Sequence, residues 1–114
     1  MLEAREQERV DTAPVIRYWT AGNPMVISQA YNLSKNGILF NTGKEYPKDT
    51  PVYVQMRSPQ KLNETITFKA KVIRQERKEE EYLYKTAAEI VAFYDEDDSK
   101  RLQGYIDFAR SCTQ

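Results

Sequence analysis

The chain has 114 residues, with 17 Lys and Arg against 17 Asp and Glu, no His and a single Cys. This length indicates one domain, and a formal net charge of zero excludes a basic nucleic-acid coat or an acidic tail over the whole chain. The lack of His removes the commonest general base and zinc ligand, and one Cys excludes an internal disulfide. Residues 1–78 carry thirteen basic and eight acidic side chains, a net charge of +5, so an anionic ligand is sought there.

No apolar run approaches the roughly 18–20 residues of a membrane span. The first residues also lack the apolar stretch of a secretory signal. We therefore expect a cytoplasmic protein.

From residue 14 onward, the chain is typical of short strands separated by turns. Alternating or continuous apolar runs bounded by turn residues predict strands over 15–20, 25–33, 38–40, 52–57, 66–72 and 82–93. In the second strand a two-residue spacing is carried by Met25, Ile27, Tyr31 and Leu33. The charged stretch from 75 to 81 is interpreted as a hairpin tip or its exposed flanks.

Only the tail changes to a helical spacing. Leu102, Tyr105, Ile106 and Ala109 follow one another at the intervals of one helix face. Asp95 is the expected N-cap of this helix.

Six strands in about 100 residues would leave long unprotected edges in an open sheet, and closure into a barrel removes them. We therefore predict an all-β fold, a six-stranded antiparallel barrel whose C-terminal helix covers one mouth or packs against the wall. Residues 14–114 form this domain. Residues 1–13 are mostly polar and are expected to form a flexible arm.

Two arginines stand four residues apart in that arm. Arg5 and Arg9 fall on one side of a helix, and also of an extended strand, because four is an even number. A guanidinium group is a planar fork that suits phosphate oxygens or the edge of guanine. Taken alone, the pair is more simply interpreted as part of a solvated arm.

A second motif lies between the second and third predicted strands. Asn32 and Ser34 are two residues apart, so both polar groups are expected on one face of the strand. Their amide and hydroxyl groups suit the edge of a purine. Gly37 allows a positive φ and lets a ligand approach the backbone, although Asn36 followed by Gly37 is also an ordinary hairpin turn.

Together, an R-x-x-x-R arm and an N-x-S-x-x-G turn in a six-stranded barrel chain resemble the PilZ domain family. The resemblance extends along nearly the whole chain, with weaker matches at 71–74, 88–93 and 102–106. It implies a small bacterial barrel that binds the second messenger cyclic di-GMP and has no catalytic role, no metal and no cofactor.

The resemblance also implies residue roles. Arg5 and Arg9 would grip phosphates and guanine edges, Asn32 and Ser34 would bind a guanine from its other side, and Gly37 would keep the turn open. Ala4 stands where many members carry a further Arg, which favours one bound ligand over an intercalated pair. Ordering of the arm would then signal to an unidentified protein partner that controls motility, adhesion or exopolysaccharide output.

Other interpretations stay open at this point. A barrel that docks a protein without nucleotide is the main alternative, and binding of single-stranded nucleic acid is disfavoured by the zero net charge. Lys69 and Lys71 share one face of a predicted strand; a partner patch or a secondary phosphate contact is weighed there against a simple solvated exterior. An enzyme is the least expected, because no nucleophile has a base beside it.

Overall fold

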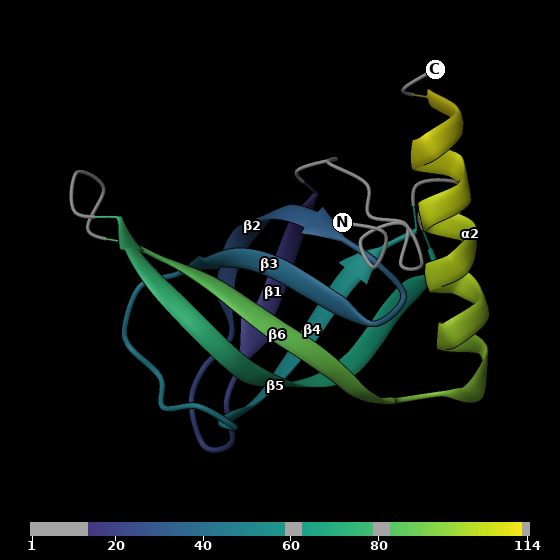
Figure 1. The fold of residues 1–114 in the computed structure, drawn as a ribbon. Coiled ribbons are helices and arrows are strands. Elements are labelled where there is room, and N and C mark those ends of the chain that lie inside the picture. Colours follow the sequence, from purple (N-terminus) through teal and green to yellow (C-terminus); the bar gives the residue numbers. More distant parts are fainter. Residues whose placement is uncertain (1–13, 59–62, 79–82, 113–114) are drawn as a thin grey trace.

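The computed structural model describes residues 14–58, 63–78 and 83–112. This part of the chain folds into a six-stranded barrel followed by one helix (Figure 1). The elements are β1 Val15–Trp19, β2 Val26–Leu33, β3 Gly37–Thr42, β4 Pro51–Arg57, β5 Thr65–Lys78, β6 Leu83–Phe93 and α2 Glu96–Cys112. The predicted arm, with Arg5 and Arg9, lies outside the described residues.

The strands pair only in antiparallel fashion and close a ring in the order β1-β2-β3-β6-β5-β4. Closure is made by β4 pairing back to β1, with Arg17 opposite Gln55. The predicted fold class is thereby confirmed. Figure 1 shows β3 and β6 at the front of the barrel and β1 and β4 behind them, so these two pairs of strands form opposite walls.

Alternation along the strands sends every second side chain into one core. In β5, Ile66, Phe68, Ala70 and Val72 are buried, as their spacing predicts. β5 continues beyond its predicted end at 72 to Lys78, whereas β6 begins at Leu83, within the predicted strand 82–93. The hairpin of these two strands projects from the barrel in Figure 1. Residues 75–78, which were predicted as a hairpin tip or its exposed flanks, are therefore part of a paired strand.

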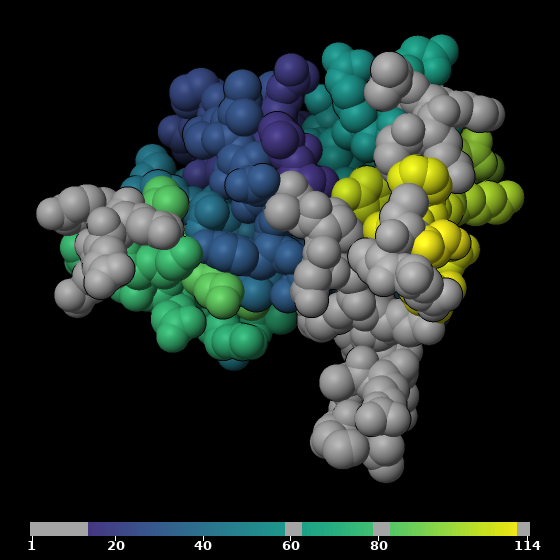
Figure 2. Space-filling view, turned by 90° about the horizontal axis from the view of Figure 1, so that it is seen from above, coloured from purple at the N-terminus to yellow at the C-terminus, as the bar shows by residue number. Residues whose placement is uncertain are grey.

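Helix α2 stands at one end of the barrel, and the β5–β6 hairpin reaches out at the other (Figure 2). Leu102, Ile106 and Ala109 of α2 are buried in the same core as the strands. The predicted N-cap is confirmed, since the Asp95 carboxylate accepts a hydrogen bond from the Asp97 amide at 2.8 Å. Among the described residues, α2 included, no helix has the length and apolar character needed to cross a membrane.

A bulge in β2 changes which residues face the core. The pairing with β3 shifts between Ala30 and Asn32, which leaves Tyr31 as the extra residue. Because the bulge reverses the alternation, Leu33 is fully buried whereas Ile27 is 70% exposed. The two-residue spacing of apolar residues predicted for this strand therefore does not place all of them on one face of β2.

A hydrogen-bonded polar cluster fills the barrel interior away from α2. The Gln75 amide donates to the hydroxyls of Thr42 (3.1 Å) and Thr86 (2.9 Å), which are themselves 2.9 Å apart. Its carbonyl oxygen accepts from the Tyr46 amide at 2.7 Å. Burial first, and then the charge and hydrogen bond of Tyr18, raise the pKa of Tyr46 to about 12. The folded chain therefore favours the neutral form of Tyr46.

The raised pKa predicts a loss of stability at high pH. Above pH 10 the unfolded chain releases the Tyr46 proton while the folded chain keeps it, so the free energy of unfolding falls between pH 10 and about 12. Denaturant unfolding at pH 9, 10 and 11 should show a smaller fall in Tyr46→Phe than in the wild type. Tyr94→Phe, at a side chain 85% exposed, should behave like the wild type. Equal slopes in Tyr46→Phe and the wild type would contradict this.

Candidate functional site

The reversal between β2 and β3 is closed by the side chain of Ser34. Its hydroxyl oxygen accepts hydrogen bonds from the amides of Gly37 (3.1 Å) and Asn36 (3.3 Å), and the Ser34 amide donates to the Gly37 carbonyl at 2.9 Å. Ser34 is fully buried and lies just past the end of β2. The expectation that Asn32 and Ser34 share one strand face is therefore wrong, because the chain has already left the strand at Ser34.

Gly37 ends the turn as the first residue of β3. Among the described glycines only Gly22 has a positive φ, so the expected left-handed backbone at Gly37 is not found. The reason for glycine here is space. An added Cβ would lie 3.0 Å from the carbonyl oxygen of Ala88 in β6. The Asn36 carbonyl also accepts a hydrogen bond from the Ile90 amide at 2.8 Å, so the turn is fastened to β6.

The β2 bulge places Tyr31 and Asn32 next to this turn. The Tyr31 hydroxyl donates to the Asn41 side chain at 2.7 Å and accepts from the Lys78 ammonium group at 2.6 Å. The ammonium groups of Lys78 and Lys85 lie 5.0 and 4.8 Å from the centre of its ring. Tyr31 is thus held by three strands, which fixes the backbone beside Asn32.

Asn32 opens into a hollow of about 780 Å³ on the outer wall. The β2–β3 turn, β6, β5 and the loop before β4 surround it, and its lining includes Asn32, Gly37, Lys48, Asp49, Lys71, Ile73, Arg74 and Glu89. This volume falls in the range of about 300–1,000 Å³ that is usual for small-molecule sites. The hollow is therefore large enough for a small organic ligand.

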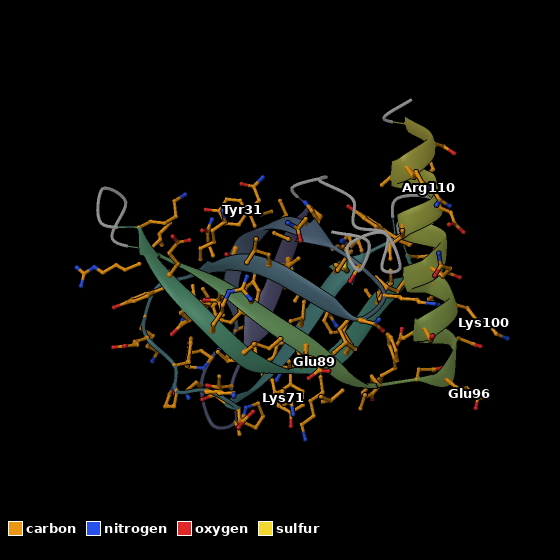
Figure 3. All side chains as sticks on the ribbon, in the orientation of Figure 1. Tyr31, Lys71, Glu89, Glu96, Lys100 and Arg110 are labelled. Atoms are coloured by element: carbon orange, nitrogen blue, oxygen red, sulfur yellow. The ribbon has the colours of Figure 1, made fainter. Side chains whose placement is uncertain are left out.

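Three cations and two carboxylates give the hollow its charge, a net +1 from Lys48, Lys71, Arg74, Asp49 and Glu89. The Lys71 ammonium nitrogen is 3.9 Å from a Glu89 oxygen and 4.0 Å from an Asp49 oxygen. Figure 3 shows Lys71 and Glu89 close together on neighbouring strands. Such long, half-exposed ion pairs contribute little, so an incoming anion can replace them.

A second bulge, at Ile73, turns Arg74 toward the same hollow. The pairing of β5 with β6 shifts between Val72 and Arg74, so Ile73 is the extra residue. Val72 is buried, while Ile73 and Arg74 are both exposed and line the hollow. Two bulges, one in β2 and one in β5, therefore aim polar side chains at one place.

The structure thus brings together part of the set expected from the sequence. Asn32 and Gly37 line the hollow, whereas Ser34 lies behind it as the side chain that closes the turn. Lys71 and Arg74 also line the hollow but were not among the predicted site residues. Lys71 was weighed only for a partner patch or a secondary phosphate contact, because its sequence signal was a general excess of cations in the fifth strand. Within the described ranges, no group of His, Cys, Asp or Glu is arranged to hold a metal ion.

Comparison with known families matches the PilZ domain over residues 3–108. The chain belongs to the PilZ domain family. Comparison with curated protein sequences finds no match.

Solved structures similar to this PilZ domain share its fold at low sequence identity. The Bacillus subtilis inhibitor of motility matches with a TM-score of 0.73 and 19% identity over 94% of this chain and 52% of its own. The MrkH protein of K. pneumonia, in complex with c-di-GMP, matches with a TM-score of 0.68 and 14% identity over 96% of this chain and 54% of its own. The PilZ domain of YcgR from Escherichia coli, with c-di-GMP, matches with a TM-score of 0.61 and 17% identity over 96% of this chain and 93% of its own. The chain thus spans about half the length of the first two.

The contact at Gly37 predicts an asymmetry between two glycines at the ends of β3. Gly37→Ala should lower the free energy of unfolding by about 1–3 kcal/mol, because its methyl group meets the rigid Ala88 carbonyl. Gly43→Ala is the matched control, since no heavy atom lies within 4 Å of its added Cβ. Denaturant unfolding of both variants measures the difference. Equal stability of the two variants would show that the β3–β6 contact is not close.

Proposed function

We propose that this PilZ domain is a non-catalytic bacterial receptor that binds cyclic di-GMP and signals to a protein partner. The observation that carries the proposal is the hollow in which Asn32 and Gly37 meet Lys48, Lys71 and Arg74. Two similar structures, of MrkH and of the YcgR PilZ domain, are complexes with c-di-GMP. Family, motif and local charge therefore support the same ligand.

The chemistry of the hollow suits a ligand with two guanines and two phosphates. The Asn32 amide both donates and accepts, as the edge of guanine requires. Arg74 offers a planar fork for a phosphate or a guanine face, and Lys71 offers a compact charge for a phosphate. Lys71 would exchange its distant contacts with Glu89 and Asp49 for shorter contacts with the ligand. The barrel side of the site thereby neutralises part of the ligand's charge of −2.

Arg5 and Arg9 would supply the remaining charge from the arm, as the R-x-x-x-R motif implies. Ser34 would act through the turn, because its hydroxyl already bonds the Asn36 and Gly37 amides. The arm would lose conformational entropy as it closes over the nucleotide, and charge-assisted hydrogen bonds would offset this cost. The position of the arm would then report the bound state to a partner.

Calorimetric titration of cyclic di-GMP into the purified chain tests the assignment. Arg9→Ala and Arg74→Ala should each weaken binding by at least about tenfold, because each removes a hydrogen bond between charged groups. Lys100→Ala is the control, since Lys100 points away from the barrel on α2 (Figure 3). A wild-type chain that gives no binding heat would instead support the nucleotide-free docking module.

Removal of a carboxylate from the hollow should have the opposite effect. Glu89→Gln keeps the side-chain shape but frees Lys71 from a carboxylate 3.9 Å away. We expect cyclic di-GMP to bind about two- to fivefold more tightly, which is the scale of an exposed ion pair. Asp97→Asn, at an exposed position in the first turn of α2, serves as the charge-matched control. Weaker binding by Glu89→Gln would place the phosphates elsewhere.

A further inference from the structure

A second surface of the barrel, beside the nucleotide hollow, has its own organisation. It is formed by the outward side chains of β1, β4 and residues 65–69 of β5, and is called here the β1–β4–β5 wall. The strand register places Trp19, Tyr53 and Lys69 in one row and Arg17, Gln55 and Thr67 in the next. This wall shares no lining residue with the nucleotide hollow, although the two approach each other on β5, where Lys69 and Lys71 are two residues apart.

An apolar groove of about 800 Å³ runs along the aromatic row of this wall. The rings of Trp19 and Tyr53 stack there, with centroids 5.7 Å apart and planes inclined by 17°. Met25 and Tyr94 also line the groove, although they are 53% and 85% exposed. Large apolar groups that cluster in the open in this way mark interaction surfaces.

The groove continues into a smaller hollow that carries cations. Val15, Arg17 and Arg57 line this second hollow, which shares Gln55 and Thr65 with the groove. Val15 is 65% exposed. Trp, Tyr and Arg side chains are enriched at the hot spots of protein–protein interfaces, which contribute most of the binding free energy.

The wall is also one-sided in charge. Residues 15–19, 51–57 and 65–75 contain no Asp or Glu, whereas Arg17, Arg57 and Lys69 project from its three strands. Among the described residues that line the groove, the carboxylates are those of Asp95, just before α2, and Asp98, in its first turn, and both have local partners. Asp98 bonds the Arg101 guanidinium at 3.1 Å, and Asp95 caps the Asp97 amide. The charge presented by the strands is therefore positive.

We propose that the β1–β4–β5 wall is the docking surface for the partner protein, and that the partner contributes an acidic segment with an apolar or aromatic anchor. The anchor packs beside the Trp19–Tyr53 pair, and the segment's carboxylates pair with Arg17, Arg57 and Lys69. This inference rests on the proposed receptor function, whose partner it describes. Because the two sites share no lining residue, nucleotide and partner bind at the same time.

Trp19 supplies a direct readout, since the chain has a single Trp. The probe is a synthetic peptide of about 16 residues that alternates Asp and Glu with Leu and Phe, titrated into the full chain while Trp19 fluorescence is followed. A saturable change is expected. The same peptide with Lys for each acid, or with Ser for each apolar residue, should bind at least about tenfold more weakly.

Charge-reversal variants link the signal to the wall. Arg17→Glu combined with Arg57→Glu should weaken the acidic peptide at least about tenfold. Lys100→Glu combined with Arg110→Glu, both on α2 (Figure 3), should leave it unchanged. Calorimetry of the wall variant with cyclic di-GMP should give the wild-type affinity, which also shows that the variant is folded.

Three results would overturn the docking proposal: no response to the acidic peptide, equal or tighter binding of the basic peptide, or self-association of the chain that Arg17→Glu abolishes. The last would identify a second copy as the occupant. Failure of the wild-type chain to bind cyclic di-GMP would remove the receptor function alone, so the two failures are distinguishable.

Discussion

The close contact between the start of β3 and β6 is the constraint on which the site depends. At Gly37 the strands approach so closely that a Cβ would lie 3.0 Å from the Ala88 carbonyl oxygen. The Ser34 hydroxyl closes the turn from inside, and the Ile90 amide holds the Asn36 carbonyl from the neighbouring strand. Asn32 is thus presented by a backbone that is fastened at both ends, and a fixed donor set loses little entropy on binding a ligand.

Two bulges shape the outer hollow of this barrel. In a regular strand, Ala30 and Asn32 would lie on the same face. Because Tyr31 is an extra residue, Ala30 is buried in the core whereas Asn32 lines the outer hollow. The extra residue Ile73 has the same effect in β5 for Arg74. Each bulge gives up one regular strand position and re-aims a polar side chain. The β1–β4–β5 wall keeps a regular register between its strands, which aligns its aromatic and cationic side chains in rows.

Much of the fold could be predicted from the sequence because strand alternation is a local signal. The run from Ile66 to Val72 shows this clearly, and so do the helical spacing of the tail and its cap at Asp95. The roles of Ser34 and Gly37 could not be predicted in the same way. The Ser34 hydroxyl is spent inside the turn, on the Asn36 and Gly37 amides, and the same residue types would also suit a ligand contact. The glycine makes room for the carbonyl of Ala88 in β6, which lies about fifty residues later.

The same limit applies to the charged side chains. Lys71 and Arg74 belong to the hollow only because barrel closure brings β5 and β6 beside the β2–β3 turn. In the sequence they are two cations among several in a polar stretch. Likewise, Trp19 and Tyr53 are separated by more than thirty residues, and only the pairing of β1 with β4 stacks them. Local patterns therefore predicted the elements, while long-range pairing determined both surfaces.

The most direct test of the account is an NMR titration of the isotope-labelled chain with cyclic di-GMP, in which backbone amide shifts locate the ligand. The account predicts that the largest shifts among the described residues fall at 32–37, 71–74 and 87–89, with the amides of Trp19 and Tyr53 nearly unchanged. Shifts concentrated on the β1–β4–β5 wall, or none at saturating nucleotide, would contradict it.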